Sequence, residues 1–132
     1  MRQLSSGVGE WRGNITAGKD ARVTLAAGSF VTYGNLLAGA NTLSISNVNT
    51  FTMSAGQFLG DKTTGDGALH KSGSGGMFLR GATLTGSVVV AQGQLRLAES
   101  LAVPNGALRL QDRTALTSSD STERTVAKPV HV

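Results

Sequence analysis

Apolar residues recur in alternating pairs along most of this chain, at an interval of about 20 residues. In the second half, Val88 and Val90 are followed 20 residues later by Leu108 and Leu110. The first half shows the same offset between two sets of four residues, namely Val23, Leu25, Val31 and Tyr33, and then Leu43, Ile45, Phe51 and Met53. Short strands that alternate inside and outside at a fixed period are typical of a solenoid.

The alternation predicts short strands bounded by Gly, Asn or Ser residues, which favour turns. These are Ala21–Leu25, Phe30–Tyr33, Thr42–Ser46, Thr50–Ser54, Met77–Arg80, Ala82–Thr85, Ser87–Ala91, Gln94–Ala98 and Ala107–Gln111. No 12-residue window shows the spacing of three and four residues that a long amphipathic helix requires. We therefore predict an all-β fold, a single-stranded parallel β-helix (β-solenoid) of about five coils of roughly 20 residues, with inward side chains in ladders.

One domain with three regions is expected. Residues 1–12 form an N-terminal cap or extension in which Trp11 serves as a hydrophobic plug, residues 13–117 form the solenoid, and residues 118–132 form a polar tail. The segment 60–76 interrupts the period and is predicted to be a loop excursion from one coil. The many glycines are attributed to tight reversals with positive φ at the corners.

Composition favours a narrow core and excludes several kinds of chemistry. Apolar residues make up 39% of the 132 residues, but aromatic residues only 5%, so the chain has few large side chains with which to fill a wide interior. The absence of cysteine excludes disulfides and thiolate metal sites. No apolar run is long enough for a transmembrane helix, and the N-terminus does not have the apolar middle of a secretory signal.

The formal net charge of +4 comes from basic residues that are scattered singly along the chain. A nucleic-acid groove usually has clustered basic residues with aromatic residues between them, so we expect no nucleic-acid partner. Arg80, Arg96 and Arg109 are predicted to lie on one face of the stack, where they would allow contact with an anionic glycan or lipid.

The run from Lys71 to Leu97 carries a recognisable repeat, with a KxGxGxLxLxG opening, a bend containing Thr-Gly, and a GxLxL close. The matching residues are Lys71, Gly73, Gly75, Leu79 and Gly81 in the opening, Thr85 and Gly86 in the bend, and Gly93, Leu95 and Leu97 in the close. This run resembles the passenger-domain repeat of bacterial autotransporters, with Met77 where Leu is commoner. More loosely, WRGNITAGKDARVTL (residues 11–25) is similar to the coil openings of large passengers of the secreted-protease type.

The resemblance implies a right-handed parallel β-helix that is exported across the outer membrane and is extracellular or on the bacterial cell surface. Family members attach to the membrane through a C-terminal barrel, which this sequence does not contain, so we expect a passenger segment. The GDSGS nucleophile motif of the protease members is also absent, because residues 71–76 read KSGSGG.

No constellation in the sequence favours catalysis, and we expect a protein that is not an enzyme and has no cofactor, metal ion or catalytic residue. Ser74 is interpreted as a turn residue and His70 as a solvated loop residue. Asp61 and Asp66 do not have the further ligands of a calcium loop. The remaining carboxylates fall in predicted turns or tails rather than as a pair within a groove.

The leading hypothesis is a structural or adhesive β-solenoid segment of an exported bacterial surface protein, which presents a rigid binding surface. Its expected partners are a host glycan or matrix protein, and copies of itself through exposed coil ends, since unpaired strand edges favour association. The alternative is a phage or viral fibre or decoration subunit that forms a β-rich oligomer. Binding residues are not assigned by the sequence.

Overall fold

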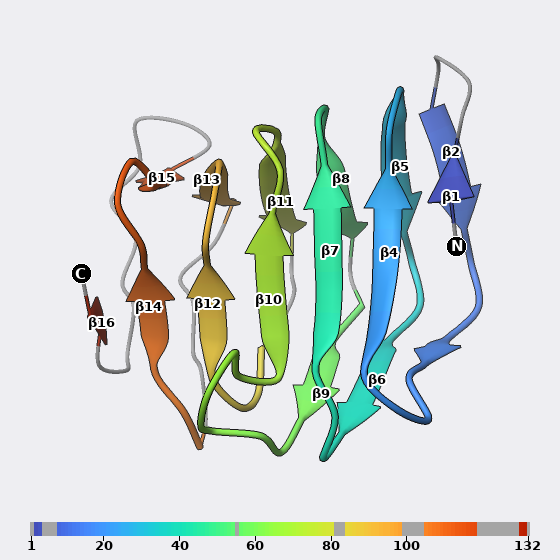
Figure 1. Ribbon diagram of the computed structural model, residues 1–132. Helices are drawn as coiled ribbons and strands as arrows, with labels where there is room; N and C mark the ends of the chain where they lie inside the picture. Colours follow the sequence, from blue (N-terminus) through green and yellow to red (C-terminus); the bar gives the residue numbers. More distant parts are fainter. Residues whose placement is uncertain are drawn as a thin grey trace.

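Strands of successive coils pair in parallel, so that the chain winds into a β-solenoid of about five turns with a spacing of about 21 residues. The computed structural model describes residues 2–3, 8–54, 56–80, 84–98, 105–118 and 130–131. Figure 1 shows the strands side by side, with β1 and β16 at opposite ends of the stack. The described residues contain no helix, and therefore no helix with the length and apolarity needed to cross a membrane. The predicted fold class is confirmed.

Three sheets form the sides of the stack. The seven-stranded sheet contains β1 (Arg2–Gln3), β4 (Ala21–Leu25), β7 (Leu43–Asn47), β10 (Leu69–Ser72), β12 (Val88–Val90), β14 (Leu108–Leu110) and β16 (Val130–His131). The six-stranded sheet contains β2 (Val8–Trp11), β5 (Ser29–Thr32), β8 (Phe51–Ser54), β11 (Gly76–Arg80), β13 (Gln94–Leu97) and β15 (Ala115–Ser118). The three-stranded sheet contains β3 (Ile15–Thr16), β6 (Leu36–Gly39) and β9 (Phe58–Gly60).

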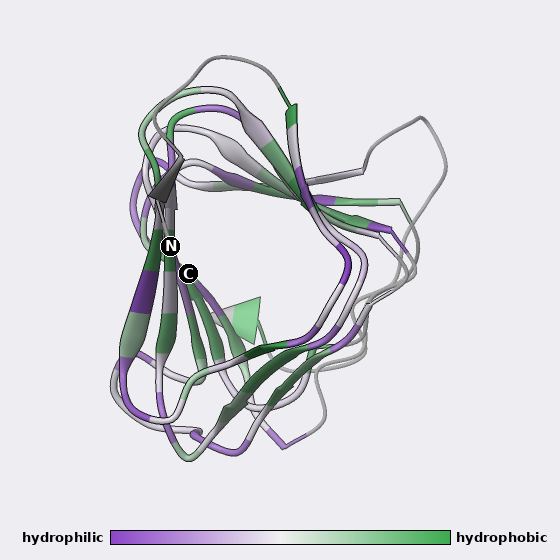
Figure 2. Ribbon diagram, turned by 90° about the vertical axis from the view of Figure 1, so that its right-hand side faces the viewer, coloured by the Kyte–Doolittle hydropathy of each residue, from purple (hydrophilic) through white to green (hydrophobic). Residues whose placement is uncertain are grey.

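Inward side chains of these sheets meet along the axis and form the core, because alternate residues of a strand point to opposite faces. Figure 2 looks along the stack and shows the coils superimposed as a ring. Each inward row continues through the cross-strand partners of neighbouring coils. One such row of the six-stranded sheet is Phe30, Phe51, Met77 and Leu95, and within it the Phe30 and Phe51 rings stack with centroids 6.0 Å apart.

The pairing register confirms the 20-residue offset in the second half of the chain and corrects it in the first. Val88 pairs with Leu108, as predicted. Val23, however, pairs with Ile45, 22 residues later, because the corners of the first coils are longer. On the six-stranded sheet Phe30 pairs with Phe51, so Phe30 points inward and Val31 points outward. A slip of one residue exchanges the two faces of a strand, so the predicted match of Val31 with Phe51 and of Tyr33 with Met53 was wrong.

Strand pairing extends beyond residues 13–117 at both ends of the chain. The stack begins before residue 13, because β1 and β2 already pair with β4 and β5. Trp11 lies opposite Thr32 and is 42% exposed, so it is not a buried plug. Within the expected tail, β16 pairs with β14, and residues 119–129 lie outside the described residues.

The predicted loop at 60–76 is confined to residues 61–68, because β10 and the first residue of β11 fall inside it. This excursion explains the longest coil, in which Leu43 pairs with Leu69, 26 residues later. The predicted strand at 82–85 lies partly outside the described residues, but Leu84 forms a bridge with Phe58 that continues the three-stranded sheet.

Glycines at one corner are required by close approach of the backbone and not by positive φ. A Cβ atom on Gly34 would overlap the carbonyl oxygen of Gly13 in the preceding coil, and one on Gly56 would overlap that of Gly34. Positive φ, the reason we predicted, applies at other corners, where Gly28, Gly39, Gly86 and Gly93 all have it. Stacking glycine on glycine therefore allows coils to approach to strand-pairing distance at this corner.

Candidate functional site

Three features stand out in the described residues: a buried lysine, an arginine-rich outer face and a groove under the loop of residues 61–68. The lysine is Lys71, which lies inward on β10 between Ile45 and Val90 and is 0% exposed. Its Nζ atom donates hydrogen bonds to the carbonyl oxygens of Ser72, Gly73 and Gln92, at 2.8, 2.9 and 3.2 Å. An ammonium group has three donors, so this arrangement satisfies all of them.

Burial lowers the pKa of Lys71 from 10.5 to about 8, because the surrounding protein disfavours the charged form. All three acceptors are backbone carbonyls, so the charge is balanced by dipoles and not by a carboxylate. Asn47 is buried at the preceding coil, where its Nδ2 atom donates to the carbonyl oxygens of Asn49 and Gly76. Both polar side chains tie neighbouring segments of backbone together inside the stack, which assigns them a structural role.

The outer face of the six-stranded sheet carries cations beside aromatic rings. On β11, the Arg80 guanidinium lies 6.0 Å from the centre of the Phe78 ring, and Arg96 on the neighbouring β13 lies 5.6 Å from the same centre. Nearer the N-terminus, the Arg12 guanidinium lies 4.7 Å from the centre of the Tyr33 ring. We call these five residues the arginine face.

The arginine face follows from the alternation of each strand. On β11, Phe78 lies between the inward residues Met77 and Leu79, and Arg80 follows Leu79. Because alternate residues of a strand point to opposite faces, Phe78 and Arg80 point to the outside of the stack. Phe78 and Arg96 are direct cross-strand partners, which places the ring beside the guanidinium stem. Arginine over a ring is attracted by the electron-rich face, so the ring restricts where each guanidinium lies.

Charge on the arginine face is largely unneutralised. The one salt bridge among the described residues joins Arg12 to Glu10 at 3.2 Å, and both side chains are well exposed. Arg80 and Arg96 have no carboxylate partner within the described part of the chain. Arg109, which we expected on the same face, lies on β14 of the seven-stranded sheet, so that prediction was wrong for one of the three arginines.

The loop of residues 61–68 is held to the next coil by hydrogen bonds. The Ser87 hydroxyl donates to the carbonyl oxygen of Thr63 at 3.0 Å, and the Ser87 amide donates to that of Lys62 at 3.0 Å. The Lys62 ammonium in turn donates to the hydroxyl of Thr42 at 3.0 Å. At the other end of the loop, the Ala68 amide donates to the carbonyl oxygen of Ser87 at 2.8 Å, so both ends are fixed against the sheet.

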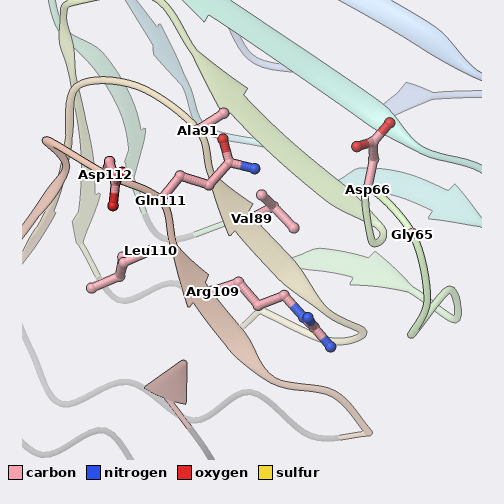
Figure 3. A pocket seen from close by; sticks show the side chains of 8 residues that line it. All are labelled: Gly65, Asp66, Val89, Ala91, Arg109, Leu110, Gln111 and Asp112. Atoms are coloured by element: carbon pink, nitrogen blue, oxygen red, sulfur yellow. The ribbon is translucent and has the colours of Figure 1, made fainter. Parts of the chain in front are cut away.

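Below this loop lies an open groove of about 600 Å³ on the outer face of the seven-stranded sheet. Figure 3 shows Asp66 on the loop side and Arg109 on the opposite side, with Val89 between them. The groove is lined by Gly65, Asp66, Val89, Ala91, Arg109, Leu110, Gln111 and Asp112. Val89 points outward, yet it is only 3% exposed. The groove therefore combines an apolar floor with charges of both signs.

The residues considered for catalysis and metal binding are not assembled into a site. Ser74 is exposed in the corner after β10, whereas His70 lies partly buried on that strand, and no hydrogen bond joins them in the described part of the chain. Asp61 and Asp66 are both exposed. Within the described ranges, no group of three His, Asp or Glu side chains is close enough to hold a metal ion.

The sequence did not reveal that Lys71 and Asn47 are buried, or that Phe78 pairs with Arg96. Lys71 was counted in a glycine-rich loop because the sequence around it reads HKSGSGG. The usable signal was its position in the period, since Leu69 and Lys71 occupy the two inward places that Val88 and Val90 occupy one coil later.

Comparison with known proteins identifies no relative. No protein-family model matches the chain, and no curated protein or solved structure matches it either.

Proposed function

We propose that this chain is a structural and adhesive segment of an exported bacterial surface protein, and that its role is to present a rigid binding surface. The observation that carries the proposal is the in-register pairing of strands through five coils, which fixes outward side chains in rows. A rigid scaffold lowers the entropic cost of binding, because its side chains are already positioned before the partner arrives. Extended stacks of repeats commonly serve as such binding surfaces.

The expected partners are host glycans or matrix proteins, and the role is not catalytic. The arginine face and the groove under the loop provide polar contacts without a hydrogen-bonded nucleophile and base among the described residues. The core is buried within one chain, with Met77, Val90 and Leu95 at 0% exposure. Because this core needs no second chain to cover it, we prefer the surface protein to the oligomeric viral or phage fibre.

Binding of the purified, folded chain to immobilised glycans and extracellular-matrix proteins tests the adhesive role. We expect saturable binding to at least one class of these molecules, and a folded chain that binds none of them would contradict the adhesive role. The export component is tested separately by the flanking coding sequence. An upstream export signal with a downstream membrane anchor would support it, and neighbouring tail-assembly genes would support the fibre.

A further inference from the structure

We infer that the arginine face binds acidic polysaccharides, with the polysaccharide lying along the stack and across the strands of the six-stranded sheet. This inference rests on the proposed adhesive role and specifies both the surface and the class of partner. Arg12, Tyr33, Phe78, Arg80 and Arg96 supply the contacts.

The register places these residues along the axis of the stack. Thr32, Met53 and Leu79 are cross-strand partners and form one inward row. The residues that follow them along their strands are Tyr33, Ser54 and Arg80, which therefore form one outward row. Thr52, Phe78 and Arg96 form the neighbouring row. Arg12 and Arg96 belong to coils four strand spacings apart, a separation of about 19 Å along the axis. An extended chain with repeated charges suits this linear arrangement better than a compact ligand.

The positive charges of Arg80 and Arg96 indicate that the partner is an anion. Arg80 and Arg96 share the Phe78 ring and have no acidic partner in the described ranges, so their outer N–H groups are free to donate to a carboxylate or sulfate. The Phe78 ring limits the movement of both guanidinium groups, which reduces the entropy lost on binding.

Hydroxyl-bearing neighbours favour a sugar over a nucleic acid. Thr52 and Ser54 lie in the same outward rows and can exchange hydrogen bonds with ring hydroxyls. Nucleic-acid surfaces use clustered basic residues and aromatic rings that stack on bases, whereas here the rings of Tyr33 and Phe78 are already associated with arginine.

The test measures binding of the chain to dextran sulfate, polygalacturonate and uncharged dextran, with duplex DNA as a further probe. We expect binding to one or both acidic polysaccharides and none to dextran, and the two acidic probes distinguish sulfate from carboxylate recognition. The double variant R80Q/R96Q should weaken this binding about tenfold, because it removes two charge-assisted contacts. F78L should weaken it by a smaller factor while leaving the charge unchanged.

The matched control is K19Q/R22Q, which removes the same charge from exposed positions on β4 of the seven-stranded sheet and in the corner before it. Its dissociation constant for the acidic polysaccharide should lie within about twofold of that of the unaltered chain, since these residues are remote from the arginine face. Equal losses in both double variants would show attraction to net charge only and would overturn the inference. Tighter binding to DNA than to either polysaccharide would also overturn it, whereas binding to neutral glycans alone would overturn it but leave the adhesive role intact.

Discussion

The Nζ atom of Lys71 donates a hydrogen bond to the carbonyl oxygen of Gln92, 3.2 Å away in the following coil. This bond links two coils through the interior of the stack, at a position where the neighbouring coils have Ile45 and Val90. A buried cation held only by carbonyl dipoles makes stability depend on pH, because its charged form is less favourable in the folded chain than in the unfolded chain.

Stability should therefore rise with pH in alkaline solution. Lys71 has a lowered pKa of about 8 when folded, against 10.5 when exposed, so the unfolded chain binds more protons between these values. The penalty is fully present below about pH 8 and is relieved toward pH 10.5. We expect the free energy of unfolding to increase by about 2 kcal/mol between pH 7 and pH 10. Urea unfolding at a series of pH values measures it.

Lys71→Met is the matched variant for this prediction, because methionine retains much of the apolar stem and removes the titrating group. The free energy of unfolding of this variant should not increase between pH 7 and pH 10, whereas that of the exposed-site variant Lys19→Met should still increase. A rise of the same size in the Lys71→Met variant would assign the pH dependence to other groups.

Gly34 should not tolerate a side chain. Its substitution by alanine places a Cβ atom against the carbonyl group of Gly13, so the coils must separate, at a cost of about 2 kcal/mol. Gly18→Ala provides the control, since nothing lies within 4 Å of the Cβ position there and its φ is not positive. Chemical denaturation should show a loss of stability for Gly34→Ala alone. If both variants were equally stable, the close approach of the coils at this corner would be wrong.

An acidic residue in the core should disrupt the stack. Val90→Asp or Leu108→Asp buries an unpaired carboxylate at positions that are 0% exposed, which costs several kcal/mol, on the order of 3 or more. Val48 is 50% exposed, so Val48→Asp should change stability by less than about 0.5 kcal/mol. Circular dichroism during thermal unfolding distinguishes these cases. Retention of the native transition by the Val90 variant would contradict the assignment of faces.

The loop of residues 61–68 should accept added residues where other corners do not. Insertion of Gly-Gly-Ser after the exposed Gly65 lengthens an excursion whose ends are fixed by Ser87, and should cost less than about 1 kcal/mol. The same insertion after Gln92 separates β12 from β13 and displaces an acceptor of Lys71, so it should cost several times more. Urea unfolding of the two insertion variants measures the difference, and equal losses would contradict this account.

The sequence predicted the parallel solenoid because inward apolar residues alternate at a regular interval, and it located β4 at its observed bounds. It did not predict the register of the first coils, since polar and glycine-rich corners carry no periodic signal that fixes their length, and Val23 pairs with Ile45 and not with Leu43. β6 and β9 were missed because short runs such as LLAG and FLG resemble turns. The arginine face depends on register between strands, so Phe78 could be matched with Arg96 only once the coils were aligned.

Each strand of this stack finds its partner in the adjacent coil, within about two dozen residues along the chain. A completed coil consequently offers a template on which the next one forms, and assembly need not wait for the whole polypeptide. Folding can therefore nucleate at one coil and propagate to its neighbours, one coil at a time.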